Sequence, residues 1–90
     1  ATETRYHARD DLLAPDLATL AMLDDTAFRK KFSGSPIKRI GRDRFIRNVA
    51  YAIGNSGQRD LLPVVKQLIK DDDSTVAEAA TWASAKLSRL

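Results

Sequence analysis

Apolar residues recur three and four positions apart along most of this chain, and this spacing constrains its fold more than any other feature. In the second half it defines two stripes that we expect to be buried: Leu61, Leu62, Val65, Leu68 and Ile69, followed by Val76, Ala80, Ala83 and Leu87. Such spacing is typical of amphipathic helices, whereas the strict alternation of a half-buried strand is absent. The pattern predicts an all-α fold.

Two short helices are expected first. A proline and an aspartate at positions 15 and 16 can begin one helix, and either Asp24 or Asp25 can cap the next. Phe28 and Phe32 lie four positions apart in the second helix, and we predict that both rings belong to the core.

A longer helix is predicted over residues 36–53. Ser35 can cap this helix, and Pro36 suits its first turn. Gly41 costs a regular helix about 0.5–1 kcal/mol relative to alanine, so we expect a kink, a restart or the close approach of a neighbouring backbone there. The glycines within residues 54–57 should end the helix with a left-handed cap.

Two further helices complete the predicted fold. One begins near Asp60, and Thr75 with Glu78 matches a capping box for the other. Helices joined by turns of a few residues pack as antiparallel hairpins, so we expect a HEAT-repeat-like, right-handed stack of about five helices. This stack would be a single domain over residues 15–90, preceded by a polar strap or linker over residues 1–14.

Basic residues gather in the middle of the chain. Between Arg29 and Arg47 there are eight of them against Asp43 alone, a net charge of +7, whereas the rest of the chain carries −4. A band of this kind attracts phosphate, so we expect a nucleic acid as the partner.

A helical wheel of residues 41–53 separates a core side from an outer side: Phe45, Val49, Ala52 and Ile53 on the first, and Arg44, Arg47, Asn48 and Tyr51 on the second. Arginine forks grip phosphates, and a tyrosine ring can stack on a base. The candidate RNA-binding residues are therefore Lys30, Lys31, Lys38, Arg39, Arg42, Arg44, Arg47 and Tyr51. The same pattern would arise from a plain solvated face with ion pairs, or from a surface for an acidic protein partner. Arg47 with Asn48 could instead bond to the backbone of the 54–55 turn.

Trp82 is predicted to face away from Ala80 and Ala83 and so to be partly exposed. We interpret it as a contact with a neighbouring domain, as a ring on which a base stacks, or as a staple against Leu61.

The chain offers little for catalysis. It has no cysteine, which excludes disulfides, thiolate chemistry and cysteine-ligated metal sites within it. Its one histidine, His7, has only Asp10 and Asp11 nearby, and we interpret it as a surface residue. We therefore predict no catalytic, cofactor-binding or metal-binding residue. No apolar run approaches the roughly 20 residues that span a bilayer, and we expect a cytoplasmic monomer without membrane contact.

Two stretches resemble known families. Residues 60–83, with Asp-Leu-Leu-Pro at their start and Ala-Ala-Thr-Trp-Ala at their end, resemble a HEAT-type repeat. Residues 34–42, Gly-Ser-Pro-Ile-Lys-Arg-Ile-Gly-Arg, and the following stretch to residue 55 resemble more sharply the C-terminal domain of epoxyqueuosine reductases. Residues 9–17 are similar to the strap that follows the last cluster cysteine of that family. In all, the resemblance covers roughly residues 9–88.

This resemblance implies that the chain is one module of an oxidoreductase. The family reduces epoxyqueuosine to queuosine in the anticodon loop of tRNA, with a cobalamin-binding domain and two [4Fe–4S] clusters in the part that precedes this helical region. It implies contacts with the tRNA anticodon arm and with those N-terminal domains. No cluster ligand is carried over, because the chain has no cysteine. The alternative is a HEAT-type scaffold that docks an acidic protein partner.

Overall fold

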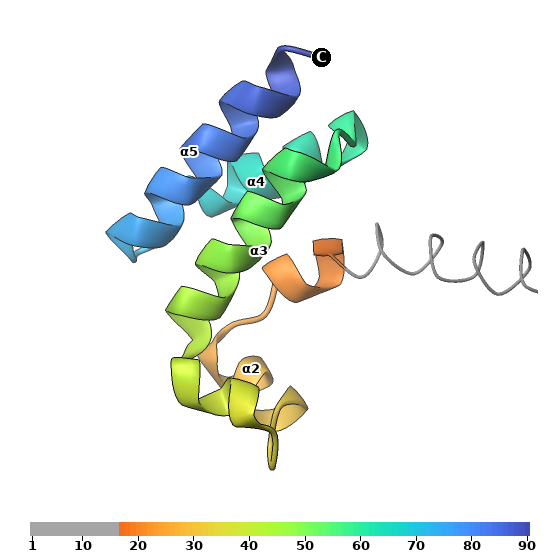
Figure 1. Cartoon of the computed structure of the whole chain (residues 1–90). Coiled ribbons are helices and arrows are strands. Elements are labelled where there is room, and N and C mark those ends of the chain that lie inside the picture. Colours follow the sequence, from red (N-terminus) through yellow and green to blue (C-terminus); the bar gives the residue numbers. More distant parts are fainter. Residues whose placement is uncertain (1–16) are drawn as a thin grey trace, which may run out of the picture.

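The computed structural model describes residues 17–90, and helices with short turns account for all of this part, without a strand (Figure 1). After a helical segment at residues 17–21, the elements are α2 (Asp25–Lys31), the 3-10 helix η1 (Pro36–Ile40), α3 (Arg42–Ser56), the 3-10 helix η2 (Arg59–Leu61), α4 (Leu62–Leu68) and α5 (Ser74–Ser88). The predicted all-α class is confirmed. The expected strap at residues 1–14 and the start of the first helix lie outside the described residues.

The main core lies between α3, α4 and α5. Helices α3 and α5 make the most extensive contact in the molecule, and Figure 1 shows them side by side and running in the same direction, with α4 behind them. Burial of aliphatic side chains from these helices, at about 25 cal/mol per Å² of apolar surface, drives their association. The buried residues of this core are Ala21, Ile46, Val49, Ala50, Ile53, Leu61, Val65, Leu68, Val76, Ala79, Ala80, Ala83 and Leu87. A right-handed HEAT-type stack remains a prediction.

Three phenyl rings attach α2 to the start of α3. The ring centroids of Phe28 and Phe32 are 5.1 Å apart, and each lies 5.0–5.3 Å from the ring of Phe45 in a tilted arrangement. Such tilted pairs contribute about 0.5–1.5 kcal/mol each beyond the apolar area that they bury. Phe28 is fully buried, which confirms its predicted core role, whereas Phe32 is only half-buried at the edge of this ring cluster.

Polar caps fix where the short helices begin. The carboxylate of Asp24 accepts a hydrogen bond from the backbone N–H of Ala27 at 2.7 Å, so Asp24, one of the two predicted residues, caps α2. The Ser35 hydroxyl caps η1 in the same way, accepting from the N–H of Ile37 at 3.2 Å. The predicted restart at Gly41 is confirmed, because η1 ends there at a positive φ of 85° and α3 follows.

The cap of α5 differs from the prediction. Asp73, not Thr75, is the N-cap, and α5 begins at Ser74. The Asp73 carboxylate accepts hydrogen bonds from both the backbone N–H and the hydroxyl of Thr75, at 3.1 and 2.9 Å. A charged acceptor two positions earlier thus accepts from the threonine hydroxyl that the capping box would have used.

The core side of α3 is rotated relative to the predicted wheel. Ala52 is exposed, while Ile46 and Ala50 are buried beside Val49 and Ile53. The reason is that α3 packs mainly on α5, so the side that faces α5 sets the buried stripe. The helix also continues past the predicted end at residue 53, and its left-handed cap is Gly57, with φ 71°.

Gly54 lies inside α3 at its closest approach to α5. A Cβ atom built on Gly54 would lie 2.5 Å from Cζ3 of Trp82 and 3.0 Å from Cα of Ala83. Both distances are shorter than van der Waals contact, so the absence of a side chain at this position permits the spacing of the two helices.

We predict that Gly54→Ala destabilises the fold by about 1–2 kcal/mol. In an open helix the change would stabilise by about 0.5–1 kcal/mol, but overpacking here costs about 1–3 kcal/mol. Urea unfolding measures the loss, and Trp82, the one tryptophan of the chain, should change its emission as its packing shifts.

Gly57→Ala is the matched control. Nothing lies within 4 Å of a Cβ atom there, but the positive φ costs a non-glycine residue about 1–2 kcal/mol. This variant should lose stability without a change in Trp82 emission in the folded state. A Gly54→Ala protein as stable as the parent would contradict the close approach.

Candidate nucleic-acid interface

Arg42, a candidate RNA-binding residue, is occupied by contacts within the fold. Its Nη1 and Nη2 atoms donate to the two carboxylate oxygens of Asp71 at 3.0 and 2.8 Å, and its Nε donates to the backbone carbonyl of Leu23 at 3.0 Å. The side chains of Arg42 and Asp71 are only 16% and 13% exposed. The ion pair therefore ties the start of α3 to the turn before α5, and it leaves the guanidinium little access to a ligand.

This ion pair shifts the pKa of both side chains. The hydrogen bond from Arg42 lowers the pKa of Asp71 below its ordinary value, against the opposing effect of burial, and the N–H of Asp73 adds to the lowering. The hydrogen bond to Asp71 raises the pKa of Arg42, with Asp43 as a weaker contributor and burial opposing. Each charge thus stabilises the other in the folded state.

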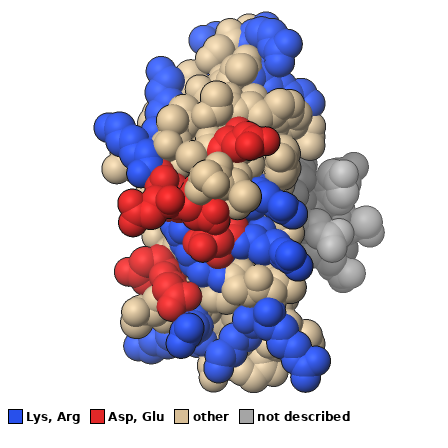
Figure 2. Space-filling model, turned by 90° about the vertical axis from the view of Figure 1, so that its left-hand side faces the viewer, with Lys and Arg blue, Asp and Glu red and all other residues tan. Residues whose placement is uncertain are grey.

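Acidic residues surround Arg42 on this side. A surface hollow is lined by Arg42 together with Asp24, Asp25, Asp43, Asp71, Asp72 and Asp73. Figure 2 shows acidic side chains gathered across the middle of this face, with basic side chains above and below them. Like charge disfavours a polyanion in this hollow.

The outer side of α3 presents arginines of a different kind. Arg44 and Arg47 are separated by three positions, and Tyr51 lies four positions further, so the three side chains form one row along the helix. Within residues 17–90 neither arginine has a carboxylate partner. Arg44 is exposed, and Arg47 is half-buried with an Nε atom that is buried and unpaired. These two guanidiniums are the cations of α3 that remain available to a phosphate.

The alternative role of Arg47 and Asn48, bonding to the backbone of the turn at residues 54–55, is not supported: neither side chain makes a hydrogen bond to this turn within residues 17–90. The end of α3 is instead held by Ser56, whose hydroxyl donates to the carbonyl of Ile53 at 2.6 Å and accepts from the N–H of Gln58 at 3.2 Å.

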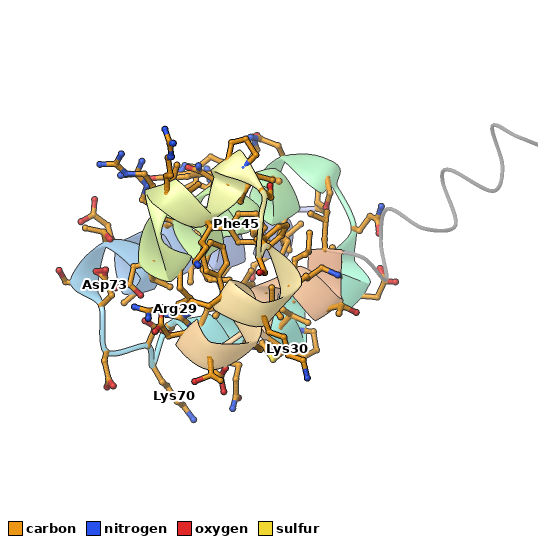
Figure 3. The ribbon with its side chains drawn as sticks, turned by 90° about the horizontal axis from the view of Figure 1, so that it is seen from below. Arg29, Lys30, Phe45, Lys70 and Asp73 are labelled. Carbon is orange, nitrogen blue, oxygen red and sulfur yellow. The ribbon has the colours of Figure 1, made fainter. Side chains whose placement is uncertain are left out.

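The remaining candidate cations lie on α2 and η1. Lys30 and Lys31 are exposed in the last turn of α2, and Figure 3 shows Lys30 on the same side of the molecule as Lys70, with α3 on the opposite side. Lys38 and Arg39 are exposed on η1 beside a shallow hollow that also involves residues 34–36. The structure thus brings Arg44, Arg47 and Tyr51 together and places Lys30 apart from them.

The surface beside Tyr51 includes residues from α5 that sequence reasoning did not combine with it. The ring centroids of Tyr51 and Trp82 are 5.3 Å apart, and the Lys86 ammonium lies 5.0 Å from the centroid of the Trp82 ring. The partial exposure predicted for Trp82 is confirmed, at 37%. The helical spacing of Trp82 relative to Ala80 and Ala83 was enough to predict this exposure. The proximity of the two rings was not predictable in this way, because it depends on the packing of α3 against α5.

We predict that Asp71→Asn costs about 1–3 kcal/mol at neutral pH, because the partly buried guanidinium of Arg42 loses its charged partner. The folded-state pKa of Asp71 is lowered, so the unfolded chain takes up the proton first as pH falls. The stabilisation is therefore complete above about pH 4, the ordinary range of an aspartate, and is lost below it as pH approaches the lowered value. Urea unfolding of parent and variant at pH 7 and pH 3 should show the difference shrinking in acid.

Asp43→Asn is the control for this ion pair. Its carboxylate also contacts Arg42, at 3.0 Å, but is 59% exposed, so its removal should cost less than about 1 kcal/mol. Equal losses for the two variants would show that Asp71 has no special role.

The described residues contain no group of three or more potential metal ligands, and none of their helices is long and apolar enough to cross a membrane. The residues present also do not fit an iron–sulfur cluster, since the chain has no cysteine thiolates to ligate one.

Fold and surface together define a small all-α module with an open cationic and aromatic face. The chain is 39% identical over 88 residues to an epoxyqueuosine reductase of Xanthomonas campestris pv. campestris, 38% identical over 87 residues to one of Shewanella oneidensis, and 33% identical over 85 residues to one of Escherichia coli (strain K12). These matches cover 93–94% of the chain. The chain is therefore related, over nearly its whole length, to a segment of the epoxyqueuosine reductases, as its motifs predicted.

The chain spans 22–24% of the length of these relatives. No family model matches it, and no solved structure does so.

Proposed function

We propose that this chain is the tRNA-binding module of an epoxyqueuosine reductase, which positions the anticodon arm while the rest of the enzyme reduces epoxyqueuosine to queuosine. The observation that carries the proposal is the row of Arg44, Arg47 and Tyr51 on α3, whose two arginines have no carboxylate partner within residues 17–90. The relationship to epoxyqueuosine reductases supplies the substrate.

Phosphate contacts account for the binding energy in this proposal. Each guanidinium that neutralises a phosphate releases condensed counterions, so binding is favoured at low salt and carries little sequence information. With few such cations in one row, the chain alone should bind tRNA weakly, in the micromolar range or above, as sequence-independent contacts do. Lys38 and Arg39 are exposed on η1, the 3-10 helix that precedes α3, and extend the same interface. Arg42 is not part of it.

The reduction itself belongs to the remainder of the parent oxidoreductase in this proposal. Cobalamin and two [4Fe–4S] clusters would be held there, and cluster thiolates must come from outside this chain, which has no cysteine. Positioning of the anticodon arm by a separate module would contribute to catalysis by orientation, without a reacting group of its own.

Replacement of both arginines, Arg44→Glu with Arg47→Glu, should weaken binding to all tRNAs about equally, on the order of tenfold at low salt, and reduce the salt dependence by about two counterions. Fluorescence anisotropy of labelled tRNA over a salt series measures both quantities. Circular dichroism verifies that the half-buried position 47 accepts the change.

Lys66→Glu with Lys70→Glu is the matched control. Both lysines are exposed, and Lys70 lies on the side of the molecule opposite α3 in Figure 3, so the same change of charge there should have a much smaller effect. If both double variants weakened tRNA binding equally, the effect would come from net charge alone, and the proposed interface on α3 would be wrong. Binding to heparin as tight as to tRNA would favour a scaffold for acidic partners instead.

A further inference from the structure

Two aromatic rings from different helices meet on the surface of this module. Tyr51 of α3 and Trp82 of α5 are 39% and 37% exposed, with ring centroids 5.3 Å apart and ring planes inclined by 57°. Rings of this size normally gain stability by full burial, at about 25 cal/mol per Å² of apolar surface. Two that remain open to solvent in contact with each other form a surface suited to a flat, apolar ligand.

Trp82 is held in place from beneath. The Cζ3 atom of its indole lies 2.5 Å from the point where a side chain at position 54 would begin, so the ring packs against the backbone of Gly54. Packing against the backbone on one side, and against Tyr51 on another, limits the orientations that the indole can adopt. A preorganised ring binds a stacking partner at a smaller entropic cost than a free one.

A cation accompanies this aromatic pair. The Lys86 ammonium lies over the Trp82 ring, 5.0 Å from its centroid, and donates to the side-chain oxygen of Asn55 at 2.6 Å. On α3, Arg47 lies one turn before Tyr51 and is also without a carboxylate partner within residues 17–90. Glu78, one turn before Trp82, is the one acidic residue of α5, and the two cations Lys86 and Arg47 outnumber it beside the two rings. The partner that combines flat rings with negative charge is a nucleotide.

We propose that Tyr51, Trp82 and Lys86 form a stacking site for one unpaired nucleobase of an RNA. The base occupies the face of the Trp82 ring that Lys86 covers in the free protein, and the displaced ammonium pairs with the phosphate of the same nucleotide. This site rests on the proposed RNA-binding function and adds a requirement to it. Stacking needs a base that has left its own helix, so the ligand must present a loop or a single strand.

The intrinsic fluorescence of the chain tests this site directly, because Trp82 is its only tryptophan. The 90-residue chain is titrated at low salt with two RNAs of equal phosphate number, a hairpin with an unpaired loop and a blunt duplex. Anisotropy of a label on each RNA reports binding, and Trp82 emission reports stacking. We expect both RNAs to bind and the hairpin alone to quench Trp82.

A variant pair provides the second measurement. Trp82→Leu should lower affinity for the hairpin about tenfold, the effect typical of one lost stacked base, and leave affinity for the duplex unchanged. Trp82→Phe, which keeps a ring, should retain most of the hairpin affinity. If Trp82→Leu fails to fold, the quenching result with the parent chain decides.

The outcomes separate the two proposals. Binding of both RNAs with equal emission changes overturns the stacking site and leaves phosphate binding by α3 intact. Absence of binding to either RNA overturns the RNA function, and the stacking site with it. Quenching by the hairpin that persists after Arg44→Glu, with weaker affinity, supports a site distinct from the phosphate contacts.

Discussion

The close contact of α3 with α5 is the constraint on which the rest of the molecule depends. It requires small residues at the crossing, and the chain supplies Gly54 on one helix and Ala83 on the other. Burial of Ile46, Val49 and Ile53 then follows, because these positions face the core that α3 forms with α4 and α5. The same contact brings Tyr51 and Trp82 together on the outside. The distance between α3 and α5 thus determines both the buried stripe of α3 and the pairing of Tyr51 with Trp82 on the surface.

The basic residues of the chain divide into those that hold the fold and those that remain open. Arg42 pairs with Asp71, 29 positions further along the chain, and its guanidinium also donates to the backbone carbonyl of Leu23 and to Asp43. Arg44, only two positions later, points to solvent. About half a turn of helix separates these roles. The side of α3 that carries Arg42 forms an ion pair with Asp71, whereas Arg44 and Arg47 form none with a carboxylate of the described chain.

Much of the fold could be predicted from the sequence, because local rules decide it. Apolar spacing gave the buried stripe of α5, and the positive φ that Gly41 tolerates accounts for the break between η1 and α3. The site was less accessible to prediction, since it depends on contacts between distant positions. Net charge could not reveal the partner of Arg42, because Asp71 approaches only in the folded chain. The wheel of α3 wrongly assigned Ala52 to the core for the same reason, because the neighbouring helix decides which side is buried.

The cluster of Phe28, Phe32 and Phe45 holds α2 to α3 separately from the main core. Phe28, although fully buried, lies outside the aliphatic core that joins α3, α4 and α5. Segments held by few apolar contacts open at lower free energy than the main core. The lysines of α2 are therefore carried by a unit that three rings attach to α3, whereas the arginines of α3 belong to the rigid part. Opening of α2 therefore requires the loss of one aromatic cluster, and it can occur while the contact between α3 and α5 stays intact.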